Sequence, residues 1–180
     1  MKKIYIILLI TFLFCQKSPA QVKDRKVYYF LSVQADKTLY DYTIKKNKGG
    51  AGLGLQLNFQ TKTFFKPIIE LNVDGVGGPK ESIFFSGGNT SVHESKSMIS
   101  STFIGSIFIL NKHLSSSLTL GSSFFSNKAH FGIRPSLIYY PSKNQKWNTK
   151  LSFTHVPFKD EFTHQDFGYL SFSVGINLSK

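Results

Sequence analysis

Apolar and polar side chains alternate again and again from residue 27 to the end of the chain, and this alternation restricts the fold more than any other feature. In residues 49–59, for example, Leu53, Leu55 and Leu57 alternate with Gly54 and Gln56. Successive side chains of a β-strand point to opposite faces of a sheet, whereas an amphipathic helix repeats every 3.6 residues. No segment after residue 21 keeps the helical period over three turns, so the sequence predicts an all-β fold.

Eight segments share this alternation: residues 27–35, 49–59, 63–73, 97–110, 114–125, 128–140, 145–156 and 166–179. They are roughly 9–14 residues long, and a tilted strand needs about 9–11 residues to cross a membrane. Bacterial membrane barrels use an even number of antiparallel strands, beginning at eight. The pattern therefore predicts an eight-stranded antiparallel up-and-down transmembrane β-barrel.

The two faces of these segments differ in a way that separates a membrane barrel from a soluble one. One face is almost continuously apolar, and the other carries Ser, Thr, Gly, Asn and a few charges. A soluble barrel has its apolar face inside and a charged exterior, but only 18% of this chain is charged. We therefore expect the polar face to line the lumen. In residues 97–110 this rule places Ile99, Phe103, Ile107 and Ile109 outside, and Ser100, Thr102 and Ser106 inside.

The connections sort by length onto two ends. Residues 60–62, 111–112 and 141–144 are short links, which in membrane barrels lie on the periplasmic side. Residues 36–48, 74–96 and 157–165 are longer links at the other end, where one link, at 126–127, is short. The link at 74–96 contains Gly75, Gly77, Gly78, Pro79, Gly87 and Gly88 and is expected to be a flexible loop.

Aromatic side chains gather at the ends of the segments, as in the two interfacial girdles of membrane barrels. Those expected near the periplasmic interface are Tyr28, Tyr29, Phe30, Tyr139, Tyr140 and Trp147. Phe124, Phe125 and Phe158 are expected near the outer interface.

Residues 1–20 have the pattern of a secretory signal peptide. Lys2 and Lys3 precede the apolar run 4–14, and Ser18 and Ala20 supply small residues for cleavage after Ala20. We expect residues 1–20 to be removed and residues 21–180 to form the barrel domain. An uncleaved N-terminal anchor and lipidation of Cys15, the single cysteine, are the alternatives.

The chain resembles the family of small OmpA/OmpX-type outer-membrane barrels, and the resemblance covers the whole mature chain. The Ala20-Gln21 junction, the eight segments and the closing strand LSFSVGINLSK (residues 170–180) carry it. The junction and the closing strand also resemble those of exported barrel proteins from Bacteroidetes-type bacteria. The resemblance implies a Gram-negative outer-membrane location, insertion by the barrel assembly machinery, a monomer, and a non-enzymatic structural or surface-interaction role. The chain ends in Leu-Ser-Lys rather than in the aromatic residue that often closes such barrels.

The charge of the chain points to a polyanionic surface as partner. The net charge is +12, and removal of Lys2, Lys3 and Lys17 leaves 22 − 3 = 19 basic against 10 acidic residues, or +9. Export and a content of only two arginines argue against nucleic acid as a partner. The predicted partners are outer-membrane lipid and the phosphate groups of lipopolysaccharide, contacted by lysines of the first outer link. These are Lys37, Lys45, Lys46 and Lys48.

Four charged side chains fall on the predicted lumen face: Lys66, Glu70, Arg134 and Lys150. A charge in a narrow lumen needs a partner, and we expect Glu70 to pair with Arg134, with both lysines nearby. Such a network either packs the interior or serves as a gate for a small solute. Eight strands leave little room for water, which disfavours a pore.

Three alternative functions stay open from sequence: a lipid A-modifying enzyme, a narrow channel, and an exported ligand-binding barrel. The placement of His155 is similar to that of the histidine of lipid A deacylases, but residue 157 is Pro rather than the Ser expected there, and Ser152 falls on the other face of its strand. The histidines lack zinc-type spacing, so neither a metal nor a cofactor is expected.

Overall fold

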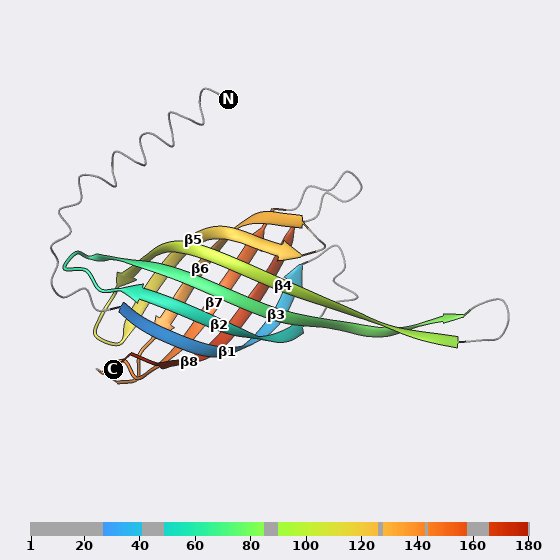
Figure 1. Ribbon diagram of the computed structural model, residues 1–180, viewed down its shortest axis with the longest axis horizontal. Coiled ribbons are helices and arrows are strands. Elements are labelled where there is room, and N and C mark those ends of the chain that lie inside the picture. The colour runs from blue at the N-terminus through green and yellow to red at the C-terminus, as the bar shows by residue number, and fades with distance from the viewer. Residues whose placement is uncertain are drawn as a thin grey trace, which may run out of the picture.

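The computed structural model describes residues 27–40, 49–84, 90–125, 128–142, 144–157 and 166–179. It contains eight strands: β1 (Val27–Tyr40), β2 (Gly49–Phe59), β3 (Phe65–Phe84), β4 (Thr90–Ile109), β5 (Leu114–Phe125), β6 (Lys128–Tyr139), β7 (Trp147–Val156) and β8 (Phe167–Asn177). Each strand pairs antiparallel with the next, and β8 pairs with β1 to close the barrel (Figure 1). The predicted eight-stranded up-and-down barrel is therefore confirmed. Within the described ranges no helix is both long and apolar enough to cross a membrane.

The barrel has two unlike ends. At the short-turn end, strands are joined by residues 60–64, 110–113 and 140–146, and β1 begins and β8 ends there. Asn111 holds one of these turns, because its carboxamide oxygen accepts hydrogen bonds from the backbone N–H groups of His113 and Leu114, both at 2.8 Å. At the other end β3 and β4 run on beyond the rest of the barrel (Figure 1).

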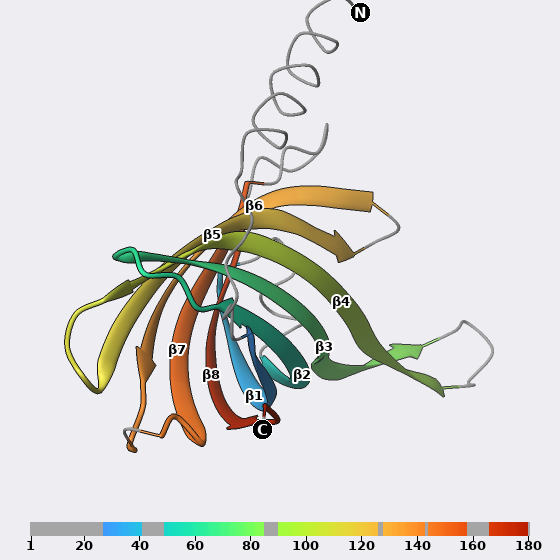
Figure 2. The ribbon, with the colours of Figure 1, turned by 60° about the vertical axis from the view of Figure 1, so that its left-hand side comes forward.

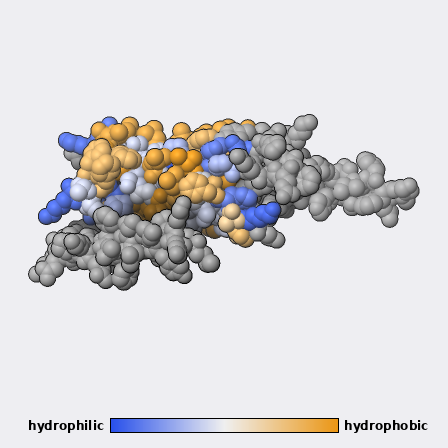
Figure 3. All heavy atoms as spheres, turned by 90° about the horizontal axis from the view of Figure 1, so that it is seen from above, coloured by the Kyte–Doolittle hydropathy of each residue, from blue (hydrophilic) through white to orange (hydrophobic). Residues whose placement is uncertain are grey.

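The side chains that point outward are apolar. Leu31, Leu53, Ile104, Phe131 and Phe172 are among the large exposed hydrophobic residues. Figure 3 shows hydrophobic residues gathered on the face of the barrel wall that is in view. The buried positions are mainly polar, as the predicted lumen face requires. A barrel with this polarity is suited to lipid outside and polar packing within.

The predicted orientation of β4 is wrong. Ile99, Phe103 and Ile107 are buried in the lumen, with exposed fractions of 2%, 0% and 3%, whereas Thr102 is exposed on the outer face. Ile109 shares the inward face of Ile107 at the open mouth and is 39% exposed. Both faces of this strand carry large apolar residues, so its alternation alone does not distinguish the two orientations. Pairing with β3, which sets Phe103 beside Glu70, fixes the inward face.

Glycines explain how a phenyl ring fits inside so narrow a barrel. Phe103 lies opposite Gly121 on β5, and Gly121 in turn lies opposite Gly132 on β6. A Cβ at Gly121 would collide with the backbone of Thr102 and Phe103, and one at Gly132 would lie 3.5 Å from the Phe103 ring. Gly121 therefore allows β4 and β5 to approach closely at Phe103, and Gly132 lies in contact with its ring.

The link at 74–96, predicted to be a loop, is mostly strand. β3 and β4 are 20 residues each, and beyond Gly77, the last β3 residue paired with β2, they form a two-stranded ribbon that extends away from the barrel (Figure 2). Their pairing is irregular between Gly77 and Lys80, a stretch that includes Pro79, which has no N–H to donate. The link predicted at 36–48 also begins late, because β1 continues to Tyr40.

Two apolar clusters fill the lumen near its ends. At the short-turn end Phe30, Ile68, Ile107, Ile138 and Tyr140 pack together, with Tyr28 against them. Near the ribbon, Val76, Ile99, Val156, Phe167 and Tyr169 form the second cluster.

The predicted interfacial aromatics therefore divide between two places. Tyr29, Tyr139 and Trp147 are exposed on the outer wall, whereas the prediction is wrong for Phe30 and Tyr140, which are buried inside. At the outer interface Phe124 is exposed, and Phe158 lies outside the described residues.

Candidate functional site

An ion cluster occupies the centre of the lumen, between the two apolar clusters. Glu70 on β3 lies 3.5 Å (Oε2 to Nε) from Arg134 on β6 and 3.1 Å (Oε1 to Nζ) from Lys150 on β7. The exposed fraction of each side chain is 5% or less. One carboxylate thus contacts two cations, and the contacts tie together strands that are not all neighbours in the barrel wall.

Lys66, the fourth residue predicted for this network, lies elsewhere. Its ammonium group donates a hydrogen bond to the Gln60 carboxamide at the short-turn end. Lys66 and Glu70 share a face of β3, but they are four positions apart, or about 13 Å along a strand.

Polar contacts continue from the ion cluster toward both ends of the barrel. Lys150 donates to Gln56 Oε1 at 3.1 Å, and Gln56 Nε2 donates to Asn58 at 2.8 Å, toward the short turns. In the other direction, Nη2 of Arg134 donates a hydrogen bond to Gln34 Oε1 at 3.5 Å, and Gln34 Nε2 donates one to the Asp74 carboxylate. The Tyr169 hydroxyl donates to the second carboxylate oxygen of Asp74 at 3.4 Å.

The ring of Phe103 supports the arginine from one side. The Arg134 guanidinium carbon lies 5.7 Å from the ring centroid, within the range of a cation–π contact. The Arg134 backbone carbonyl accepts a hydrogen bond from Thr119 Oγ1 at 3.1 Å. The guanidinium is therefore held by a carboxylate, a carboxamide and an aromatic face.

Sequence reasoning missed two lumen carboxylates. The sequence pattern places Asp74 and Asp36 in outer links, but both are buried, with exposed fractions of 0% and 8%. Asp36 is the cross-strand partner of Ser171. A signal was available, because Asp36 continues the inward series of Ser32 and Gln34, and Asp74 continues that of Glu70 and Asn72.

This arrangement supports packing rather than transport. Charges buried in a narrow interior are stable only when opposite charges and hydrogen-bond partners surround them. The cluster supplies opposite charges, Gln34 and Gln56 accept hydrogen bonds from its two cations, and apolar side chains lie toward each end. Its ion pairs hold strands β3, β6 and β7 together across the lumen. Among the described residues no group of three or more His, Cys, Asp or Glu side chains is placed to hold a metal ion.

The predicted surface residues are described only in part. Lys37 is exposed on β1 near its outer end, while Lys45, Lys46 and Lys48 lie outside the described residues, as do residues 1–20 with Cys15. His155 forms a 3.8 Å contact from Nε2 to Asp166 Oδ2. Ser152 is buried on the lumen face, so it does not share the face of His155.

A comparison with solved structures finds the same fold. The chain is similar to Ail, the attachment invasion locus protein of Yersinia pestis, crystallised in complex with the heparin analogue sucrose octasulfate: 14% identity, TM-score 0.57, covering 86% of this chain and 99% of that one. It is also similar to the Yersinia pestis outer membrane protein Ail in a phospholipid bilayer nanodisc: 13% identity, TM-score 0.55, covering 85% of this chain and 100% of that one. Neither the family models nor the curated protein sequences contain a match. The architecture of this chain is therefore that of a small eight-stranded outer-membrane β-barrel.

Proposed function

We propose that this protein is an outer-membrane barrel without enzymatic activity, which acts by presenting its ribbon end to molecules outside the cell. The filled interior carries the proposal. A buried ion cluster between two apolar clusters favours a rigid support over a conduit. Short turns lie on the periplasmic side of membrane barrels, so the ribbon of β3 and β4 would face outward.

The partner class we propose is a polyanion at the cell surface, namely the phosphate groups of lipopolysaccharide. The net charge of +9 expected for residues 21–180 supports this choice, and so do Lys37 near the outer end of β1 and Lys45, Lys46 and Lys48 after it in the sequence. Ail, which has this fold, is known in complex with a sulfated heparin analogue. Several surface lysines acting together can bind phosphate or sulfate groups without a preformed pocket.

The location is tested first, by membrane fractionation and by migration on an unboiled gel. Recovery in the outer membrane, with a compact band that shifts on boiling, is expected. Recovery as a soluble periplasmic species would contradict the proposal, because the exposed apolar wall requires lipid.

The partner is tested with two variants of equal charge. One replaces Lys37, Lys45, Lys46 and Lys48 with Gln, and the control replaces Lys62, Lys112, Lys143 and Lys146, which lie in or beside the short turns. Affinity for purified lipopolysaccharide should fall about tenfold or more in the first variant, since exposed ion pairs contribute about 0.2–1 kcal/mol each. Equal losses in both variants would show that net charge alone drives the binding.

A further inference from the structure

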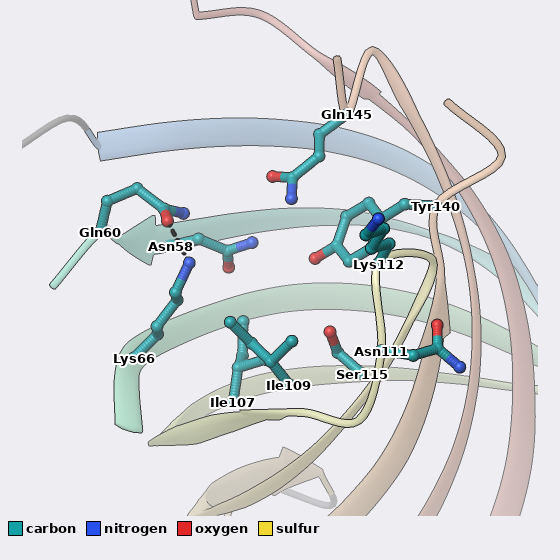
Figure 4. A pocket seen from close by; sticks show the side chains of 10 residues that line it. All are labelled: Asn58, Gln60, Lys66, Ile107, Ile109, Asn111, Lys112, Ser115, Tyr140 and Gln145. Carbon is teal, nitrogen blue, oxygen red and sulfur yellow. Dashed lines mark hydrogen bonds between the residues drawn. The ribbon is translucent and has the colours of Figure 1, made fainter. Parts of the chain in front are cut away.

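The short-turn end contains a cavity that the ion cluster does not explain. Its volume is about 160 Å³, and it lies inside the barrel mouth among residues of β2 to β5 and of the turns at 110–113 and 140–146 (Figure 4). The apolar cluster around Ile107 and Tyr140 closes it toward the barrel centre. It is therefore a pocket of the barrel mouth.

The pocket is basic. Lys66 and Lys112 line it, and none of its described lining residues is Asp or Glu. The turns around the mouth also carry Lys62, Lys143 and Lys146, and residues 60–64, 110–113 and 140–146 contain no acid in the sequence. A concave site with charge of one sign concentrates ligands of the opposite sign. The pocket thus favours an anion.

Its other groups suit more than a bare anion. Four lining residues carry carboxamides: Asn58, Gln60, Asn111 and Gln145. The oxygens of the first three already accept hydrogen bonds within the protein, so these groups offer a ligand mainly their N–H donors, whereas Gln145 can both donate and accept. In Figure 4 the side chains of Gln60, Asn58 and Gln145 surround one space, with Lys66 pointing toward Gln60. Ile107 and Ile109 form an apolar wall along one side.

The backbone at Gln145 provides a second observation. Its φ is 49°, the one positive value recorded for a non-glycine residue in the described ranges. The conformation is held by a hydrogen bond from its N–H to Ser142 O at 2.9 Å and by one from Asn177 Nδ2 to its carbonyl at 3.1 Å. A left-handed residue with a side chain costs about 1–2 kcal/mol relative to ordinary geometry, and glycine would avoid this. Such strain gathers at functional sites, and here it aims a carboxamide into the cavity.

We propose that this cavity binds the carboxylate end of a short peptide whose last side chain is small and apolar. Lys66 pairs with the carboxylate, and its hydrogen bond to Gln60 leaves two of its three N–H donors for this purpose. The carboxamides bind the adjacent peptide group through its N–H and C=O, and Ile107 and Ile109 contact the side chain. Phosphate would use the lysines but would leave the apolar wall of Ile107 and Ile109 without a partner.

The test is an isothermal calorimetric titration, in which N-acetyl-alanyl-alanine is added to the purified protein in uncharged detergent micelles and the heat of binding is measured. Its C-terminal amide, free alanine and inorganic phosphate are the comparison probes. Saturable binding of the dipeptide acid, at least about tenfold tighter than that of each comparison probe, is expected. Equal binding of the amide or of phosphate would overturn the proposal, as would tighter binding of free alanine or an absence of saturation by the acid.

Two variants connect the binding to the pocket. Lys66→Met keeps the apolar stem and should weaken dipeptide binding about tenfold, while Lys62→Met, at an exposed lysine of the adjacent turn, should leave it within about twofold. Gln145→Gly should weaken binding without lowering the melting temperature, because it removes the side chain and relieves the backbone. Equal effects of Lys66→Met and Lys62→Met would overturn the assignment, and the melting temperature of each variant shows whether the barrel is intact.

Discussion

Glu70 is the residue on which the charge balance of the barrel centre depends, because its carboxylate contacts both Arg134 and Lys150. Glu70→Gln keeps the size and removes the charge, which leaves two buried cations without that partner. The free energy of unfolding should fall by about 3–5 kcal/mol, as for other buried pairs broken from one side. Urea titration of the barrel in lipid vesicles, followed by tryptophan fluorescence, measures it.

Lys66→Met is the control for this prediction, since Lys66 lies on the same strand and face but outside the cluster. It should cost less than about 1 kcal/mol. A double variant, Glu70→Gln with Lys150→Met, should recover part of the loss, because one uncompensated cation is gone. Losses that simply add in the double variant would argue against a direct Glu70–Lys150 interaction.

Alternation predicts on which face a lumen residue lies but not its depth. Glu70, Arg134 and Lys150 meet because the strand stagger brings residues from β3, β6 and β7 to one level. That stagger is set by turn geometry and by pairing, which a period of two does not encode. For the same reason Lys66 was expected in the cluster although it lies near the mouth, and the depth of Asp74 could not be predicted.

The strand β4 shows where alternation fails as a guide to orientation. Its inward residue Phe103 is completely buried, and its neighbour Ile104 is 59% exposed on the lipid-facing wall. Phe103→Ala should remove about 3–5 kcal/mol of stability, because the volume above Gly121 and Gly132 would be left empty. The thermal midpoint of the compact band on unboiled gels is a suitable measure.

Ile104→Ala is the matched substitution on the other face of β4. Its cost should be clearly smaller, because lipid chains can fill the space of a side chain on the outer wall. A larger loss for Ile104 than for Phe103 would support the orientation that the sequence predicts for residues 97–110. That prediction fails for a physical reason. A narrow lumen needs some bulky apolar residues opposite glycines, and the sequence pattern does not distinguish these bulky residues from lipid-facing ones.

At the scale of the whole molecule, strand number, order and closure followed from the sequence, but the ribbon did not. Gly75, Gly77, Gly78 and Pro79 have low strand propensity and indicated a loop. Pairing of β3 with β4 nevertheless continues to Phe84 and Thr90, because a ladder can extend through residues that would not form a strand alone. Propensity is a weak guide wherever a neighbouring strand supplies hydrogen bonds.

The ribbon should be separable from the barrel. Gly77 pairs with Lys96, so an Asn-Gly turn in place of residues 78–95 would close the hairpin at the last β3 residue that also pairs with β2. These ribbon residues pair with one another and lie beyond the register of β2 and β5. The thermal midpoint of the shortened barrel should therefore equal that of the full chain within error.

A deeper deletion, with the same turn in place of residues 76–97, gives the contrast. It removes Val76 from the apolar cluster that it forms with Ile99, Val156, Phe167 and Tyr169. Loss of one buried valine should cost about 1.5–3 kcal/mol and lower the midpoint by several degrees. If the shorter deletion lowers the midpoint as much as the deeper one, the ribbon stabilises the barrel, and its role as a separate outward extension is wrong.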